Sequence, residues 1–132
     1  MDHHATLLAR AFETLTRDGV DAAAALLTPD FIANIPGAPA PLHGRDAWAI
    51  GVRNMLAAFP DLSITIEDAI EQDDKVAVRV RFRGTHGGPF QGIGATHRPI
   101  EFTSLELYRI EGELIAEEWV HPDIPTLMRQ IS

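Results

Sequence analysis

The chain has 132 residues, contains no cysteine and carries a formal net charge of −8. Its length fits one domain over residues 1–132, and the absence of cysteine excludes disulfides and thiolate metal sites. The acidic balance argues against binding to nucleic acid, whose phosphates attract clustered Lys and Arg. No run of about 18 apolar residues predicts a membrane span and no secretion signal is visible, so we expect a cytoplasmic protein that binds no membrane.

The first part of the chain has helical spacing. A helix is predicted over residues 5–18, with Asp2 as its cap and Gly19 as its left-handed stop. A short Ala- and Leu-rich helix over residues 22–27 follows, capped by Asp21 and closed by the Thr-Pro pair after it.

A proline-rich loop separates these helices from a third. Residues 36–41 contain three prolines, which deny the chain regular structure. A helix is then predicted over residues 45–58, because its apolar residues fall on one stripe until Pro60 stops the pattern. That stripe consists of Trp48, Val52, Met55 and Phe59.

After Pro60 the hydrophobic period changes from 3.6 to 2, which is typical of half-buried strands. The pairs Asp73-Asp74 and Glu111-Gly112 indicate turns between strands, and Asp123 is expected to start a short terminal helix. Arg79, Arg81 and Arg83 alternate and are assigned to a solvated outer face. The predicted strands cover residues 62–67, 76–83, 100–110 and 114–121.

Helices followed by a meander of strands predict an α+β domain. We expect a curved antiparallel sheet packed against the N-terminal helices, with an apolar pocket that takes a small hydrophobic molecule. The Gly-rich segment 84–94 is the local sign of bending.

Several segments follow one another in a familiar order over nearly the whole chain. They are TPDF at 28–31, AFPDL at 58–62, GTHGGPFQGI at 84–93, PIEF at 99–102 and IAEEW at 115–119. Together they resemble the SnoaL-like ester cyclases. The resemblance implies the cone fold of nuclear transport factor two, scytalone dehydratase and ketosteroid isomerase, and a homodimer. It also implies an intramolecular aldol ring closure of a polyketide methyl ester, driven by an acid/base Asp without metal or cofactor.

The catalytic residues of that family do not all have counterparts in this sequence. In an ungapped pairing of the last strand, the family's catalytic Asp falls on Val120 and its assisting His falls on Glu106. Because Val cannot transfer a proton, the family's mechanism does not carry over unchanged.

Glu106 is the most informative polar residue. We interpret it as lying across its strand from Phe102, Ser104 and Tyr108, on a mixed face that suits a pocket wall. An apolar wall would raise the pKa of the Glu106 carboxyl and make it a general acid or base near neutral pH. The alternative interpretation is a solvated or ion-paired glutamate.

The other catalytic candidates are His121, Asp123 and His86. His121 has a suitable intrinsic pKa for proton transfer, and Asp123, which the family places at this position, could orient it. The alternative, which we favour for Asp123, is that it caps the terminal helix. His86 matches the histidine of the family's GTH segment, and either faces the pocket mouth or bonds to backbone.

The candidates for substrate binding are one amide and six aromatic residues. Asn34 could donate to a substrate carbonyl or serve in the turn before the proline-rich loop. The aromatic residues could line a pocket for a flat ligand, although each also fits an ordinary core position. They are Trp48, Phe59, Phe82, Phe90, Phe102 and Trp119.

No spacing of histidines or acidic residues predicts a metal site, and no motif predicts a cofactor. Three functions remain open. The first is a lyase or isomerase that acts by proton transfer on a hydrophobic carbonyl compound, with polyketide ester ring closure as its sharpest version. The second is a cofactor-independent hydroxylase of an aromatic polyketide, and the third is a non-catalytic ligand-binding or dimerisation module.

Overall fold

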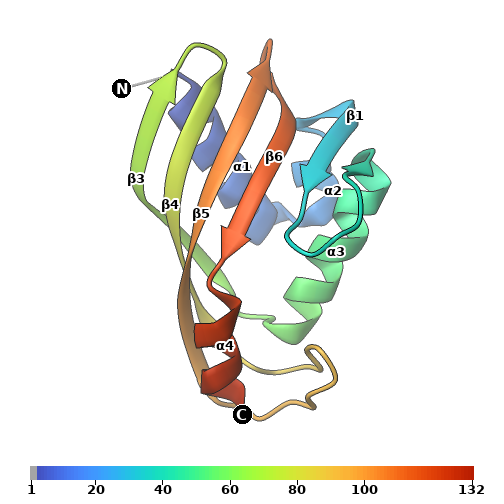
Figure 1. The fold of residues 1–132 in the computed structure, drawn as a ribbon, viewed down its shortest axis with the longest axis vertical. Helices are drawn as coiled ribbons and strands as arrows, with labels where there is room; N and C mark the ends of the chain where they lie inside the picture. Colours follow the sequence, from blue (N-terminus) through green and yellow to red (C-terminus); the bar gives the residue numbers. More distant parts are fainter. Residues whose placement is uncertain (1–2) are drawn as a thin grey trace.

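The computed structural model describes residues 3–132 and confirms the α+β class, with most helices before the strands (Figure 1). In chain order, the elements are α1 (His3–Asp18), α2 (Val20–Ala24), β1 (Leu27–Asn34), β2 (Leu42–His43), α3 (Arg45–Ala58), β3 (Ser63–Gln72), β4 (Lys75–Thr85), β5 (Pro99–Glu111), β6 (Leu114–Pro122) and α4 (Ile124–Ile131). Across these residues, no helix is both long and apolar enough to cross a membrane.

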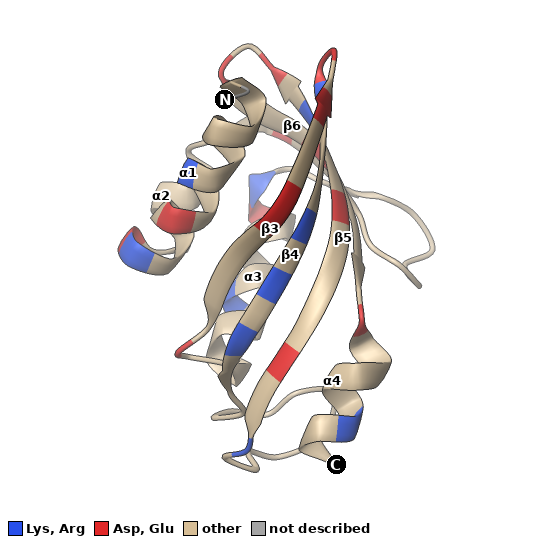
Figure 2. Cartoon of the chain, turned by 90° about the vertical axis from the view of Figure 1, so that its left-hand side faces the viewer, with Lys and Arg blue, Asp and Glu red and all other residues tan. Residues whose placement is uncertain are grey.

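The strands form one curved sheet in the order β2-β1-β6-β5-β4-β3. The helices α1, α2 and α3 lie on its concave side, and α4 lies beside the far end of β5 (Figures 1 and 2). The strands β3 to β6 pair antiparallel as expected, whereas β1 runs parallel to β6, so the sheet is mixed.

The second predicted helix is wrong in its extent and cap. The helix α2 ends at Ala24, and Gly19 rather than Asp21 is its N-cap residue. Leu27 then starts β1, and the residues expected to close the helix belong to this strand. Pro29 is accommodated because the pairing with β6 shifts register between Leu27 and Ile32, where no ladder hydrogen bond needs its missing N–H.

The curvature arises at β-bulges. One interrupts the pairing of β3 with β4 between Ile66 and Asp68, and another lies between Arg109 and Ile110 where β5 meets β6. A bulge bends its strand and increases the local twist. The Gly-rich segment forms the end of β4 and the loop after it. There Gly88 allows close contact with α3, since a Cβ would lie 2.2 Å from the Ala57 carbonyl oxygen.

The concave side of the sheet packs on the helices as the alternation predicts. On β4, four inward residues are buried, whereas the arginines between them face outward. The inward residues are Val76, Val78, Val80 and Phe82. From the helical side, Leu8 and Leu15 of α1 are buried, and Trp48 and Met55 of α3 are half-buried.

The outward arginines of β4 are paired with acidic residues of the neighbouring strands, which Figure 2 shows as blue bands flanked by red ones. Arg79 bonds to Asp68, Arg81 to Glu67 and Arg83 to Glu101. The positive charge of this cluster is therefore balanced within the sheet, on the outer face that the alternation predicts.

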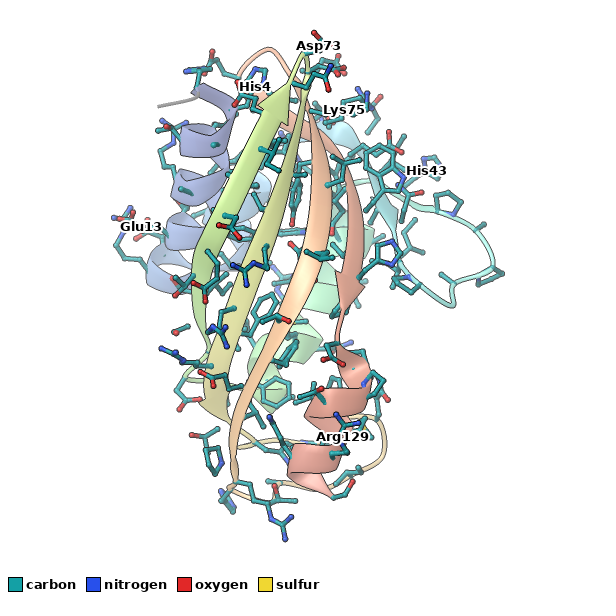
Figure 3. The ribbon with its side chains drawn as sticks, turned by 60° about the vertical axis from the view of Figure 1, so that its left-hand side comes forward. His4, Glu13, His43, Asp73, Lys75 and Arg129 are labelled. Atoms are coloured by element: carbon teal, nitrogen blue, oxygen red, sulfur yellow. The ribbon has the colours of Figure 1, made fainter. Side chains whose placement is uncertain are left out.

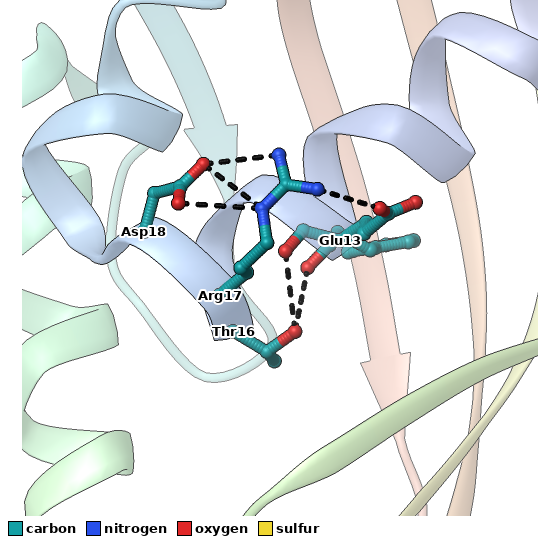
Figure 4. A network of polar contacts seen from close by, with 5 residues as sticks. Glu13, Thr16, Arg17 and Asp18 are labelled. Carbon is teal, nitrogen blue, oxygen red and sulfur yellow. Dashed lines mark hydrogen bonds and ion pairs between the residues drawn. The ribbon is translucent and has the colours of Figure 1, made fainter.

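Charged side chains also lie along α1 and at the hairpin ends. Arg17, in the last turn of α1, bonds to Glu13 at 2.8 Å and to Asp18 (Figure 4).

Gly19 has a φ of 102° and follows the helix, as predicted. Asp2, the expected cap of this helix, lies outside the described residues. Asp73 lies at the tip of the β3–β4 hairpin, with Lys75 just below it (Figure 3).

Candidate active site

Glu106 lies on the concave face of β5 and is 8% exposed. The interpretation that it lies across the strand from Ser104 and Tyr108 is wrong, because all three side chains are buried on one face. Residues two apart on a strand share a face, and the bulge in this strand comes only after Arg109. Glu106 is therefore surrounded by the core rather than by a mixed surface.

The Glu106 carboxylate has one close polar partner. The Tyr108 hydroxyl donates a hydrogen bond of 2.5 Å to its Oε1 atom. Burial raises the pKa of Glu106, and the hydroxyls of Tyr108 and Ser104 oppose this rise by stabilising the charged form. The Ser104 Oγ atom is close enough for that effect, yet within the described residues it completes no hydrogen bond of standard geometry.

A second buried carboxylate lies beside it. Glu118 of β6 pairs directly with Tyr108 and is 6% exposed. Burial, aided by repulsion from Glu106, raises the pKa of Glu118 to about 8, while a hydrogen bond with the Trp48 side chain opposes the rise. Within residues 3–132, neither carboxylate takes part in an ion pair.

Glu118 was missed at the level of sequence. It follows Glu117 in the IAEEW segment, and the two were read only as part of a family pattern. The usable signal is the alternation on β6, since Ala116 and Val120 are also largely apolar positions two residues away on either side. Since residues two apart on a strand share a face, a glutamate between these two apolar positions is predicted to face the core.

Glu118 and Tyr108 line a cavity of about 50 Å³ between the helices and the sheet. Trp48 of α3 and Phe31 of β1 border it and meet edge to face, with ring centroids 6.4 Å apart. The other lining residues are Leu8, Ala11, Phe12, Leu15, Ala23, Leu27 and Ile115. This volume holds a few water molecules, whereas pockets for drug-sized ligands measure about 300–1,000 Å³.

A second, more open pocket of about 290 Å³ lies under the proline-rich loop, at the outer face of β6. It brings together three predicted residues, Asn34, Trp119 and His121. Asn34 Nδ2 already donates to Glu117 Oε2 at 3.0 Å and to the Glu118 carbonyl at 2.9 Å. Both of its amide hydrogens are thus used, and none is left to bind a substrate carbonyl as expected.

The predicted catalytic residues do not meet in one site. His121 pairs with Leu105 and is exposed on the outer face of the sheet, opposite to Glu106. Asp123 is the N-cap of α4 and accepts hydrogen bonds from Thr126 N at 3.2 Å and Thr126 Oγ1 at 2.6 Å. These bonds lower the pKa of Asp123, so it has the capping role that was its alternative interpretation.

His86 is fully buried at the other end of the core. Its Nδ1 atom accepts from Thr96 N at 3.2 Å and lies 2.9 Å from Thr96 Oγ1, so the ring holds the loop before β5. Thr85, its neighbour, pairs with Pro99, which is seven residues before Glu106 on β5. At about 3.3 Å per residue, these seven residues span about 23 Å along β5, so His86 and Glu106 lie in different parts of the core and do not act on one atom.

Most of the aromatic residues predicted to line a ligand pocket instead fill the core at the end where His86 lies. Phe82 stacks on Phe102 at 5.0 Å, and Phe59 contacts Phe90 at 5.3 Å. Of the six predicted rings, Trp48 lines the inner cavity and Trp119 the outer pocket. Phe12 and Phe31 also line the inner cavity, although neither was predicted as a pocket residue.

The remaining histidines form no further centre. His43 is exposed, and His4 is half-buried with its Nδ1 atom 3.8 Å from Glu71 (Figure 3). Over the described range 3–132, no three histidine or acidic side chains gather as the ligands of a metal ion would.

Comparisons with known proteins agree on one family. The family model for SnoaL-like polyketide cyclases matches residues 6–131. The structure of IdmH from Streptomyces antibioticus, described as a candidate polyketide cyclase, is 29% identical, with 98% of each chain covered and a TM-score of 0.86. TsrD from Streptomyces laurentii is 25% identical, with 100% of this chain and 98% of that chain covered and a TM-score of 0.84.

A third solved structure supports the fold alone. AclR from Streptomyces galilaeus, described as a candidate hydroxylase, is 20% identical, with 96% of this chain and 79% of that chain covered and a TM-score of 0.85. Among curated protein sequences, none matches this chain.

Proposed function

Since the chain belongs to the SnoaL-like polyketide cyclase family, we propose that it is an enzyme of the lyase or isomerase type. Its substrate is a hydrophobic carbonyl compound, and ring closure of a polyketide ester is the sharpest form of the proposal. The chemistry is proton transfer by the protein's own side chains. The observation that carries it is Glu106, a buried carboxylate in an apolar core with a raised pKa.

In the proposed reaction, the Glu106 carboxylate removes a proton from the carbon next to a substrate carbonyl. The electron pair of the broken C–H bond moves into the carbonyl, which becomes an enolate. The enolate carbon then attacks a second carbonyl of the same molecule, and the new alkoxide takes up a proton. The product is a ring isomer of the substrate, so the reaction consumes no redox equivalent and releases no group.

The inner cavity has to enlarge before it can hold a substrate of this class. A polycyclic ligand does not fit into about 50 Å³, so side chains that border the cavity have to move when it binds. Phe12 and Trp48 are both half-buried and border the cavity. They are the side chains whose displacement would enlarge it toward Glu106.

The small volume of the inner cavity also favours a second candidate function, a binding or dimerisation module without catalysis. Its physical basis is that side chains fill most of the space between helices and sheet, and that Val120 stands where the family has an acid/base Asp. A ligand-binding measurement separates the two functions.

The test is a thermal-shift screen against aromatic polyketide esters, steroids and terpenoid epoxides. A ligand at 100 times its dissociation constant stabilises the protein by about 2.7 kcal/mol, which moves the midpoint by several degrees. We expect polyketide esters to give this shift. Unchanged midpoints with every class would overturn the enzymatic proposal and favour the module.

A pair of variants locates the binding site. Ala23→Leu adds volume to the inner cavity and should shrink the ligand-induced shift, measured against the variant's own ligand-free midpoint. The matched Ala38→Leu adds volume to the outer pocket and should leave the shift unchanged. The opposite pattern would place the ligand under the proline-rich loop.

We also propose a homodimer, as the family resemblance implies. On the outer face of the sheet, Ile70 and Leu105 are 73% and 63% exposed, and a second copy could cover them. Sedimentation equilibrium tests this, with Leu105→Asp expected to give a monomer. The cytoplasmic location stays a prediction, as does the absence of nucleic-acid and membrane binding.

A further inference from the structure

Two carboxylates, not one, face the interior beside the cavity. Tyr108 on β5 is directly opposite Glu118 on β6, and Glu106 is directly opposite Val120. Glu106 and Glu118 are therefore diagonal neighbours on one face of an antiparallel pair, where Cβ atoms are about 7 Å apart. Both are more than nine-tenths buried.

Across residues 3–132, no Lys, Arg or His forms an ion pair with either carboxylate. The lining of the cavity contains one acidic residue, Glu118. The residues of α1 and β1 that line it are apolar. The titratable groups that face Glu118 are Glu106 and Tyr108 on β5, and the polar group from α3 is the Trp48 indole. Two negative charges at this separation in an apolar interior repel strongly, so one carboxyl keeps its proton.

The hydrogen bonds decide which carboxyl that is. Glu106 accepts the Tyr108 hydroxyl proton at 2.5 Å and has the Ser104 hydroxyl nearby, and both favour its charged form. Glu118 is stabilised as an anion by the Trp48 side chain alone. The charge therefore resides on Glu106 and the proton on Glu118. Glu118, unlike Glu106, lines the cavity directly.

We propose that Glu118, in its neutral form, is a second catalytic residue, which donates a hydrogen bond to the carbonyl oxygen that the enolate attacks and then gives its proton to the alkoxide formed there, while Glu106 acts as the base. The inference rests on the proposed function. Glu106 takes the proton from carbon, and the electron pair moves into the neighbouring carbonyl to give the enolate. As the enolate carbon attacks the second carbonyl, the Glu118 O–H stabilises the charge that develops on the oxygen of that carbonyl. After ring closure, the alkoxide takes the Glu118 proton, and the proton held by Glu106 restores it through Tyr108.

Glutamine substitutions separate the two roles. Glu106→Gln removes the base and should lower kcat about 1,000-fold. Glu118→Gln keeps a neutral hydrogen-bond donor of the same shape and should lower kcat only about 10-fold, whereas Glu118→Leu should lower it about 100-fold. Glu101→Gln, on the outer face of the same strand as Glu106, is the matched control and should keep the activity of the wild type.

The pH profile gives a readout that a structural role would not move. Wild-type kcat should fall above about pH 8, where Glu118 loses its proton. Glu118→Gln should lack this fall, because an amide does not ionise in this range. Tyr108→Phe removes a hydrogen bond that lowers the pKa of Glu106, so the acidic limb of the profile should move to higher pH.

Difference infrared spectroscopy tests the inference without substrate. At pH 7 the wild type should show the carbonyl stretch of a protonated carboxyl group, and Glu118→Gln should lack it. The inference is overturned if the wild type lacks this band, or if an active wild type and Glu118→Gln turn over equally fast. A wild type that shows the band but converts no carbonyl substrate would instead overturn the proposed function, and the catalytic role of Glu118 with it.

Discussion

Strand β5 carries Glu101 on the outer face of the sheet and Glu106 on the inner face, and these two carboxyls behave as opposite kinds of acid. Glu101 faces outward, bonds to Arg83 and lies 3.9 Å from Arg81, and these arginines lower its pKa. Glu106, five residues later, faces inward without a cation, and burial raises its pKa. The residue type and the strand are the same, so the surroundings alone decide in which direction the pKa of each carboxyl shifts.

The same contrast applies to the whole sheet. Outside, each arginine of β4 is balanced by a carboxylate from a neighbouring strand, in contact with solvent that weakens the attraction. Inside, Glu106 and Glu118 interact with hydroxyl and indole groups and with each other. The outer face is thus a solvated charge network of small energetic weight, whereas the inner pair is costly to maintain, as functional sites often are.

Deleting one apolar side chain from each face of β5 should give the largest difference. Phe102 is 3% exposed and stacks on Phe82, so Phe102→Ala should lower the free energy of unfolding by about 3–5 kcal/mol. Leu105→Ala, at a side chain 63% exposed, should change it by less than about 0.5 kcal/mol. Urea denaturation at low protein concentration measures both, and similar losses would mean that a partner chain covers Leu105.

The inner carboxylates should make stability depend on pH in a defined direction. Above about pH 4.5 the unfolded chain releases the Glu118 proton, whereas the folded protein keeps it up to about pH 8. The unfolded state then binds fewer protons, so the free energy of unfolding falls as pH rises through this window. Glu118→Gln should make the fall smaller and raise stability at pH 8 relative to the wild type.

Glu101→Gln tests the pH dependence of stability on the outer face, as Glu118→Gln does on the inner face. The pKa of Glu101 is lowered, so its contribution is present at neutral pH and is lost as pH falls through the pKa of the folded state. Its effect on the unfolding midpoint should therefore disappear in acid. Midpoints of both variants from about pH 2 to pH 8 check the two signs, and equal signs would contradict the contrast between the faces.

A carboxylate outside the core can still matter when its partner is backbone. Asp123 caps α4 through Thr126, so Asp123→Ala should lower the unfolding midpoint by a few degrees. Asp123→Asn, which can still accept the backbone N–H, should restore most of the loss. Failure of Asn to do so would show that the charge of Asp123, and not its hydrogen bond, is what α4 requires.

The smallest effect is expected for an outer ion pair. Arg83→Ala removes the closest partner of Glu101 at a side chain 64% exposed, and should lower the midpoint by no more than about two degrees. The loss should shrink further in 1 M salt, because screening weakens exposed ion pairs. The expectation is for the monomer at low protein concentration, where a larger loss that resists salt would contradict the solvent contact of the outer face. The same result only at high protein concentration would fit the proposed homodimer.

The fold was largely predictable because its signals are local. The alternation from Val76 to Phe82 identified a strand and its inner face, and Gly19 and Asp123 marked a helix end and a helix start. The helix predicted over residues 22–27 was wrong at its C-terminal end, where Ala- and Leu-rich sequence before Thr-Pro resembles the end of a helix although β1 starts at Leu27. That segment becomes a strand only because β6, more than 80 residues later, offers it an edge to pair with.

The candidate site was only partly predictable. Glu106 was found because it departs from a family pattern, but its face was misassigned, and Glu118 was overlooked beside it. His86, His121 and Asp123 carry suitable chemistry for proton transfer and lie close to the family's motifs. The structure nevertheless places them at the far end of the core, on the outer face and at a helix cap.

The sequence by itself determined the class of the domain, the order of helices and strands, and the family, because periodicity, turn residues and ordered motifs act over a few residues. Only the tertiary structure decided which polar residues share an environment, because that depends on register between strands distant in sequence. The pairing of Tyr108 with Glu118 brings a second carboxylate beside Glu106, and burial then sets the protonation of both.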